Sequence, residues 1–257
     1  KAMTKKPQIE IPESVRHMLI ENADRYETGD FINGDPSWFM HQVQGDANRE
    51  AMAFVASCLS YGSRQQFMPK IDHLRQCCDG EMHRWIANGD FAAVLPEGCT
   101  DCLYRLYTVD MFHHFLRAYQ HLMQQYGTLG DFVRRNAATG FDAVAAICNY
   151  FATQGVSVIV PKDCTSACKR VCMFLRWMVR DGSPVDLGLW ADAIDRRTLI
   201  MPLDTHVLQQ GQHLGLLASR TASMAAAQRL TEALATVFPD DPLRGDFALF
   251  GYGVEHD

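Results

Sequence analysis

Ser166 to Arg180 reads SACKRVCMFLRWMVR, a stretch with the period of an α-helix. Its apolar residues fall in adjacent pairs that recur every three or four positions, as expected for one face of a helix. These pairs are Ala167/Cys168, Val171/Cys172, Phe174/Leu175 and Met178/Val179. The sequence therefore predicts a helix whose apolar stripe packs in the core. The residues predicted on the opposite side are Lys169, Arg170, Arg176, Trp177 and Arg180. Lys169, Arg176 and Arg180 lie seven and eleven residues apart, close to one helical line, which is expected to face solvent.

Lys169 falls in the first turn of this predicted helix, where the positive end of the helix dipole favours acidic residues. The N-terminus is expected to be capped by Asp163, Thr165 or Ser166. A cation at this position is expected to have a lowered pKa, and a partly neutral lysine amine is a nucleophile. The alternative is a solvated lysine on an exposed face.

A second stretch, Pro202-Leu-Asp-Thr-His-Val207, opens a shorter helix. The pattern predicts this helix over Thr205 to Leu214, with Gly215 as the residue that ends it. Asp204 is then the N-cap, and its carboxylate stays ionised because it accepts backbone N–H bonds. Asp204 is either a cap alone or a cap with a chemical role. His206 is expected to pack or to form a hydrogen bond rather than to bind a ligand.

Apolar stripes of helical period recur along the rest of the chain and predict an all-α protein. These stripes run over Ala51 to Leu59, Met111 to Leu122, Phe141 to Phe151 and Ala222 to Phe238. Only Val156 to Val160 alternates like a strand. The chain, residues 1–257, is expected to form a single unit of two lobes, one of residues 49–151 and the other of residues 1–48 with 155–257. A substrate cleft is expected between the lobes.

Composition limits the classes of protein that the chain can represent. Its 257 residues, 47% of them hydrophobic, can bury one large core or two small ones. No apolar run is long enough for a membrane span and no charged-then-apolar leader begins the chain, so a cytoplasmic protein without a membrane partner is expected. The net charge of −6 argues against a nucleic-acid partner unless a local basic patch provides the contacts.

The nine cysteines lack the spacing of a disulfide framework, which indicates a reducing compartment. Cys164, Cys168 and Cys172 are four residues apart, so they either share a helix face as metal ligands or pack as small core residues. Their overlap with the apolar stripe favours the core. Cys99 and Cys102 form a lone CxxC pair, which we interpret as unrelated to metal. No metal and no cofactor is predicted.

The order of these segments resembles the helix-hairpin-helix DNA glycosylase superfamily, which includes endonuclease III and the 8-oxoguanine glycosylases. Phe54 to Gln66 looks like that family's early helix and the loop that wedges into the duplex. Lys169 looks like its catalytic lysine, and Leu203 to Val207 is similar to its Val-Asp-Thr-His-Val segment. Phe247 to Gly251 resembles its final helix. The resemblance covers Arg49 to the C-terminus and implies a two-lobed helical fold with a central cleft.

Several segments also match the signatures of the bacterial family DUF2400, and the chain is identified as a member of it. These segments are Cys168-Lys-Arg, Phe174 to Val179, Pro202 to Val207, Asp241-Pro and Asp246 to Gly251. The chain departs from the glycosylases at several points. Pro161 to Ala167 replaces the hairpin's Leu-Pro-Gly-Val-Gly, whose glycines approach a phosphate. Lys169 and Asp204 are 35 residues apart because Asp181 to Leu199 is inserted, and no cysteine follows Cys172, so no iron–sulfur cluster is expected.

The resemblance implies a DNA glycosylase of base excision repair, with or without lyase activity, acting on a damaged base in duplex DNA. The base would be flipped into the cleft at a cost of a few kcal/mol. Lys169 would attack C1′, and Asp204 would stabilise the positive charge that develops on the sugar. The residues expected to contact DNA are Arg64, Gln65, Arg170, Arg176 and Arg180. The first two would fill the gap left by the base, and the other three would meet phosphates.

Two alternatives remain open from the sequence. The first is a non-catalytic nucleic-acid-binding protein of the same fold, which the missing hairpin glycines and the acidic balance favour. The second is a protein-interaction module without a nucleic-acid role. Binding that depends steeply on salt separates the two, because phosphate contacts release counterions.

Overall fold

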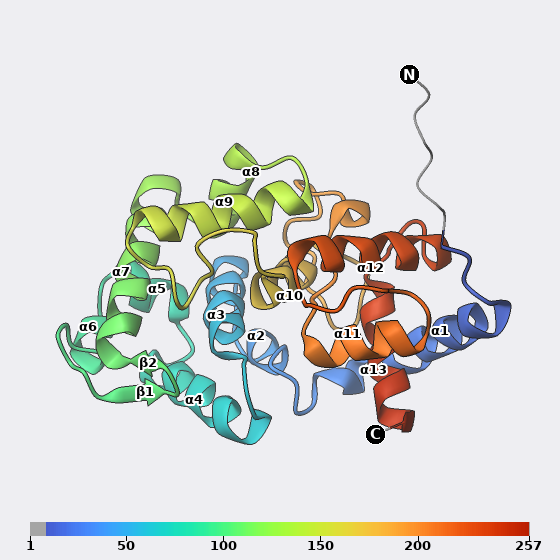
Figure 1. Cartoon of the computed structure of the whole chain (residues 1–257). Helices are drawn as coiled ribbons and strands as arrows, with labels where there is room; N and C mark the ends of the chain where they lie inside the picture. Colours follow the sequence, from blue (N-terminus) through green and yellow to red (C-terminus); the bar gives the residue numbers. More distant parts are fainter. Residues whose placement is uncertain (1–8, 257) are drawn as a thin grey trace.

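A computed structural model describes residues 9–256 as a helical protein with one small β-hairpin (Figure 1). The prediction of an all-α fold is therefore confirmed. Residues 1–8 of the predicted second lobe, and residue 257, lie outside the described part of the chain. None of the helices between residues 9 and 256 is both long enough and apolar enough to cross a membrane.

The longer helices are α1 (Glu13–Tyr26), α3 (Asp46–Leu59), α4 (Arg64–Cys77), α7 (Val109–Tyr126), α9 (Gly140–Thr153), α10 (Lys169–Val179), α12 (Met224–Val237) and α13 (Arg244–His256). The shorter elements are η1 (Gly29–Ile32), α2 (Trp38–His41), α5 (Met82–Ala87), α6 (Phe91–Val94), β1 (Cys102–Tyr104), β2 (Tyr107–Thr108), α8 (Leu129–Asn136), η2 (Arg196–Thr198) and α11 (Thr205–His213).

The four helices predicted from apolar stripes are present as α3, α7, α9 and α12. Three of them begin at a hydroxyl side chain that accepts a backbone N–H from the first turn. These caps are Thr108, Thr139 and Ser223. Such a cap satisfies a donor that has no partner within the helix, so the local sequence sets where each of these helices starts.

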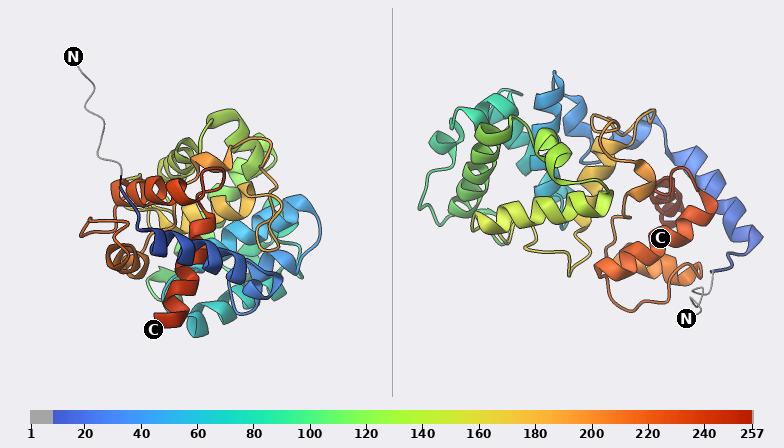
Figure 2. Two further views of the ribbon diagram at one scale, coloured as in Figure 1. Left: turned by 90° about the vertical axis from the view of Figure 1, so that its right-hand side faces the viewer. Right: turned by 90° about the horizontal axis from the view of Figure 1, so that it is seen from above.

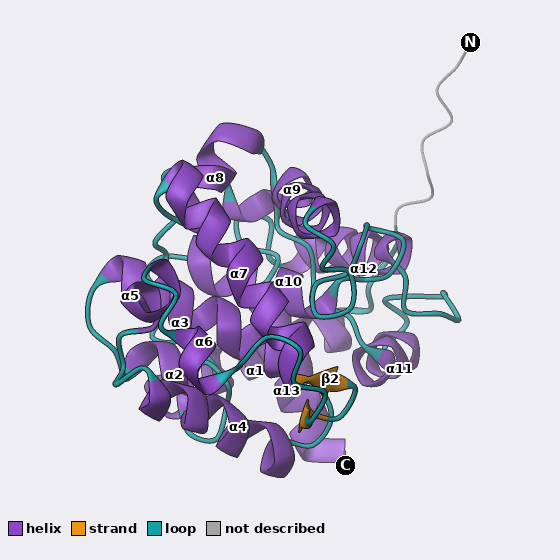
Figure 3. Cartoon of the chain, turned by 90° about the vertical axis from the view of Figure 1, so that its left-hand side faces the viewer, coloured by secondary structure: helices purple, strands orange, loops and turns teal. Residues whose placement is uncertain are grey.

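The strand-like alternation of Val156 to Val160 does not correspond to a strand. This segment is a turn-containing loop between α9 and α10, although Val156, Ile159 and Val160 are each buried. A strand is stable only beside a partner strand, and none lies next to this loop within the described residues. The observed strands, β1 and β2, form an antiparallel hairpin, drawn in orange in Figure 3. Their three and two residues are too few to show an alternating pattern.

Helix α10 lies near the middle of the molecule, surrounded by helices from distant parts of the chain (Figures 1 and 2). Helices α3 and α9 pack against it. Helix α13 packs along α1 and also contacts α11, so the beginning and the end of the described chain lie side by side. The division into lobes at residues 151 and 155 stays a prediction.

The exposed basic line predicted along α10 is wrong at its C-terminal half. Arg176 and Arg180 are only 4% and 2% exposed, and Trp177 is fully buried. Arg176 donates from Nε to Asp186 Oδ1 at 3.2 Å and from Nη1 to Asp246 Oδ2 at 2.5 Å. Arg180 is closed off from a phosphate, so its predicted contact with DNA is corrected. Arg176 is nearly buried and paired with carboxylates, which argues against its predicted contact, although its side chain borders the cavity between η1, α11 and α13.

Arg180 forms the most extensive ion pairs of the described chain. It donates to both carboxylate oxygens of Asp241, at 2.9 and 2.8 Å, and its guanidinium also pairs with Glu27 at 2.8 Å and with Asp186. Glu27 follows α1, Asp186 lies in the loop after α10, and Asp241 precedes α13. A buried cation is tolerated only with such partners. Glu27 and Asp241 lie far along the chain from the pattern that predicted the helix, and Asp186 lies just beyond its end.

Replacing Arg180 should strongly destabilise the fold. In Arg180→Ala, the buried Asp241 loses its two-bond partner and the buried Asp186 keeps only Arg176, and removing one member of a buried pair typically costs about 3–5 kcal/mol. Urea unfolding followed by circular dichroism measures this loss. Arg84→Ala, at an exposed position on α5, is the matched control and should change stability by no more than about 0.5 kcal/mol. Equal effects of the two substitutions would show that the ion pairs do not hold α10 in place.

Candidate functional site

The predicted lysine and aspartate meet at the adjoining N-termini of two helices. Lys169 is the first residue of α10 and Asp204 is the N-cap of α11. The Lys169 Nζ atom lies 2.5 Å from Asp204 Oδ2, and the two side chains are 40% and 36% exposed. The two side chains are therefore in direct contact. Both groups remain open to solvent, unlike the buried ion pairs at the other end of α10.

Asp204 is held by the start of its own helix. Its Oδ1 accepts the backbone N–H of Val207 at 2.8 Å, which confirms the predicted cap and leaves Oδ2 for Lys169. Partial burial alone would raise the pKa of Asp204, but the adjacent Lys169 charge and its hydrogen bond, together with the Val207 N–H, outweigh this effect and lower it. The site therefore keeps an ionised and fixed carboxylate at neutral pH.

The start of α10 is built differently from the prediction. The N-cap is Cys168, whose φ of 47° places it in the left-handed region, and its side chain makes no capping bond. Asp163 accepts the backbone N–H of Thr165 at 2.9 Å, within the preceding loop. The predicted caps Asp163, Thr165 and Ser166 therefore do not cap the helix. The left-handed residue turns the chain sharply, so that Lys169 points toward α11 from the first position of its helix.

Two cavities meet at this pair. One has a volume of about 540 Å³ and is bordered by the loops before α4, α10 and α11. The other has a volume of about 490 Å³ and lies between η1, α11 and α13. The residues that line both are Asp35, Arg64, Lys169, Met173 and Asp204. The lysine and the aspartate thus form part of the wall between two concave surfaces, as expected for groups that act on a bound substrate.

Arg64 and Gln65 lie at the start of α4, on the rim of this region. Arg64 donates from Nη2 to Asp35 Oδ1 at 3.2 Å, and its side chain is 53% exposed. Asp35 is itself held by the backbone N–H and the hydroxyl of Ser37. Gln65 is exposed beside Arg64 but does not line either cavity. The structure therefore places the predicted Arg64 at the site and Gln65 next to it.

Arg170 is half-buried, and its Nη1 group is used within the protein. It donates from Nη1 to the Cys58 carbonyl at 2.6 Å and to the Tyr107 hydroxyl, and its guanidinium lies 5.2 Å from the centre of the Tyr61 ring. Tyr61 also stacks edge-on with Tyr104 of the hairpin. The sequence alone assigns no role to these tyrosines. Tyr61 is an aromatic residue beside Gly62, and Tyr104 and Tyr107 lie in a short segment without a recognisable pattern.

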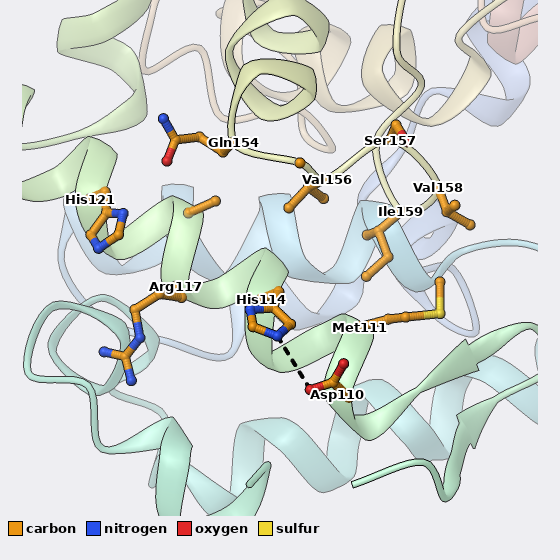
Figure 4. A pocket seen from close by; sticks show the side chains of 12 residues that line it. Asp110, Met111, His114, Arg117, His121, Gln154, Val156, Ser157, Val158 and Ile159 are labelled. Carbon is orange, nitrogen blue, oxygen red and sulfur yellow. Dashed lines mark ion pairs between the residues drawn. The ribbon is translucent and has the colours of Figure 1, made fainter. Parts of the chain in front are cut away.

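A further cavity of about 450 Å³ lies away from the pair, between α7 and the loop after α9 (Figure 4). His114 Nε2 lies 3.3 Å from Asp110 Oδ1 on its floor, and Arg117 and His121 follow along the same helix. Arg117 is already engaged by Gln120 and by the Phe91 ring. Neither predicted catalytic residue lines this cavity. Within residues 9–256, no group of three or more His, Cys, Asp or Glu side chains is arranged to hold a metal ion.

The fold and the site together define an all-α protein with a lysine–aspartate pair between two cavities. The profile of a family described as "Protein of unknown function (DUF2400)" matches residues 35–255, and the chain belongs to this family. The matched range includes both Lys169 and Asp204. No curated protein and no solved structure matches the chain.

Two substitutions at Asp204 should separate its roles as a cap and as a partner of Lys169. Asparagine caps as well as aspartate, so Asp204→Asn should lose only a half-exposed ion pair, worth about 0.2–1 kcal/mol. Asp204→Ala should be less stable than Asp204→Asn by about 1 kcal/mol, because it also loses the bond to Val207. Urea unfolding at neutral pH measures both, and equal stabilities would show that the cap contributes nothing.

The stability difference between the natural chain and Asp204→Asn should disappear in acid. The pKa of Asp204 is lowered from 3.8 in the folded state, so its contribution is complete above that value. It is lost as the pH falls through the lower, folded-state pKa. Repeating the unfolding series at acidic pH measures this. A difference that grows in acid would contradict an ionised Asp204.

Proposed function

We propose that the chain is a DNA glycosylase of the two-lobed helix-hairpin-helix type, which cleaves the N-glycosidic bond of a damaged nucleotide. The observation that supports this most directly is the 2.5 Å contact between Lys169 and Asp204 in the wall between two cavities. Cleavage of this bond needs a nucleophile at C1′ and a negative charge near the sugar. The pair offers both in one place.

The proposed reaction begins with the loss of a proton from the Lys169 ammonium, and Asp204 is the nearest acceptor at 2.5 Å. The freed lone pair attacks C1′, and the bond from C1′ to the base breaks with its electrons leaving on the base, which takes the proton from Asp204 and so restores the Asp204 carboxylate. Opening of the sugar ring then gives a Schiff base between Lys169 and C1′. The Asp204 carboxylate, fixed by Val207, stabilises the positive charge that develops on the sugar.

The 490 Å³ cavity is the better candidate for the flipped base. The rings of Phe31 and Phe250 meet in it edge to face, with their centres 4.9 Å apart, and offer aromatic surface to a planar ring. Gln210 and His206, which are 3.1 Å apart, add polar groups on the α11 side. A base held here would place its sugar beside Lys169 and Asp204.

The 540 Å³ cavity is the better candidate for the DNA strand next to that sugar. Arg64 and Arg170 contribute positive charge to it besides Lys169, and the exposed Gly62, on the loop after α3, also lines it. Gln65 lies just outside and remains a candidate to fill the space that the base leaves. Because Arg176 and Arg180 are buried, we propose that Arg64 and Arg170 make the phosphate contacts.

A Schiff base can be trapped chemically, and this provides the main test. Incubation with a duplex that contains an abasic or damaged site, in the presence of borohydride, should give a stable protein–DNA adduct. Lys169→Gln should lose the adduct while remaining folded, because the side chain is 40% exposed and lies outside the apolar stripe. Denaturing gel electrophoresis measures the adduct.

Lys162→Gln is the matched control for this experiment. Lys162 is exposed in the loop just before α10, and it lines neither of the two cavities, so its loss should leave the adduct yield unchanged. If the adduct persists in Lys169→Gln but disappears in Lys162→Gln, the nucleophile is Lys162 and our assignment of Lys169 is wrong.

Binding to duplex DNA should weaken in Arg64→Ala, and its dependence on salt should fall. Loss of one phosphate contact lowers the slope of log affinity against log salt concentration by about one. Fluorescence anisotropy with a labelled duplex at several salt concentrations measures the slope. Arg84→Ala, on α5 outside both cavities, should bind like the natural chain. If Arg84→Ala weakens binding and Arg64→Ala does not, the DNA surface lies elsewhere.

A non-catalytic nucleic-acid-binding protein of the same fold is the second candidate function. The specific observation in its favour is the loop over residues 161–167, which has no glycine where the glycosylase hairpin has two. Salt-dependent binding without any adduct or base release, over a broad panel of lesions, is the result that supports this candidate.

A further inference from the structure

The cavity of about 450 Å³ between α7 and the loop after α9 lies apart from the lysine–aspartate pair (Figure 4). One wall is a single face of α7, where His114, Arg117 and His121 follow one another at helical spacing. The other wall is the loop over residues 154–159. The face from Met111 to His121 is about 15 Å long, because a helix rises about 1.5 Å per residue. The cavity is therefore large enough for a small organic ligand.

One end of this cavity is lined by hydrogen-bond donors that the protein leaves largely unused. Figure 4 shows Gln154, His121 and Arg117 at this end. Arg117 donates to Gln120 from Nη1 and lies over the Phe91 ring, but no carboxylate between residues 9 and 256 pairs with it. The side chains of Gln154 and His121 make no hydrogen bond within the same range. An arginine without a counter-charge, beside two further donors, favours an anionic group at this end.

The opposite end of the cavity is mainly apolar. Met111, Val158 and Ile159 lie there in Figure 4. Among the residues that line the cavity, Asp110 carries the one carboxylate, which accepts a backbone N–H at 2.6 Å and lies 3.3 Å from His114 Nε2. Its charge is therefore already engaged at the floor. A thioether and branched aliphatic side chains pack well against the face of a planar ring, so this end favours the uncharged part of a ligand.

The loop wall adds peptide groups that are open to a partner. The backbone N–H groups of Ser157, Val158 and Ile159 form no hydrogen bond within the described part of the chain. Ile159 is only 2% exposed, and a polar group in such a place is stabilised by a partner. The edge of a nucleobase carries both acceptors and donors, so it can pair with consecutive peptide groups. A simple inorganic anion at the other end of the cavity would leave them unpaired.

We propose that this cavity binds a free nucleoside monophosphate. The phosphate lies at the end formed by Arg117, His121 and Gln154, where it supplies the missing counter-charge. The base packs against Met111 and meets the peptide groups of the loop over residues 157–159. The binding site is separate from the proposed glycosylase site, and it exists whether or not the chain acts on DNA.

Calorimetric titration of the natural chain with each of the four ribonucleoside 5′-monophosphates tests the inference. Inorganic phosphate and the nucleoside of the tightest-binding nucleotide are titrated separately. The nucleotide should bind at least about tenfold more tightly than either, because each of them engages only one end of the cavity. Failure of all four nucleotides to bind, or equal affinity for inorganic phosphate or for the nucleoside, would overturn the inference.

Variants assign the nucleotide to this cavity. Arg117→Ala should weaken binding by about tenfold or more, because a charge-assisted hydrogen bond to the phosphate is lost. Arg135→Ala is the matched control, since Arg135 also lies over a ring, that of Tyr126, but does not line the cavity. It should bind like the natural chain. Unchanged affinity in Arg117→Ala would place the nucleotide elsewhere. If Arg117→Ala does not fold by circular dichroism, Gln154→Ala decides, and it should weaken binding by about two- to tenfold.

Amide hydrogen exchange locates the bound nucleotide independently of the variants. The amides of residues 157–159 should exchange more slowly with the nucleotide than without it, because they gain a partner. Exchange in α1, which does not line the cavity, should stay the same. Slower exchange only around Lys169 and Asp204 would place the nucleotide at the lysine–aspartate pair and overturn the inference. Because none of these measurements uses DNA, their failure is distinct from a failure of the proposed glycosylase function.

Discussion

The buried guanidinium of Arg180 is the constraint on which the position of α10 depends. A charge at 2% exposure is stable only if carboxylates surround it, and these come from Glu27, Asp186 and Asp241. The ion pairs of Arg180 with these three carboxylates bring together the end of α1, the loop after α10 and the turn before α13. The C-terminal half of α10 is therefore fixed by charge as well as by its apolar stripe, and its N-terminal residue is held at a defined place beside α11.

The basic residues of α10 have different uses because their surroundings differ. Arg176 and Arg180 pair with carboxylates in the interior, where they stabilise the fold. Lys169 pairs with Asp204 at a place where both side chains line two cavities. Each is a salt bridge, yet only the accessible one can exchange its partner for a substrate. Asp204 contributes by its position as well as its charge, since the bond from Val207 orients it before any substrate arrives.

The parts of the molecule that local patterns control could be predicted from the sequence. Apolar stripes located α3, α7, α9, α10 and α12, and Asp204 was correctly predicted as the N-cap of α11, because capping depends on neighbouring residues only. The exposure of Arg176 was predicted wrongly, since its acidic partners lie outside the helical pattern: Asp186 is in the loop after α10, and Asp246 is on α13. The left-handed Cys168 was also missed, because a non-glycine residue in this conformation is imposed by tertiary contacts.

The central claim is that the lysine–aspartate pair breaks a bond between a sugar and a base. Single-turnover release of free base from duplexes that each contain one lesion measures this step directly. The account predicts release from at least one lesion, and Asp204→Asn should slow it by about 100-fold, because a fixed charge next to the developing cation is lost. Release at the same rate by Asp204→Asn, or no release from any lesion by the natural chain, would contradict the account.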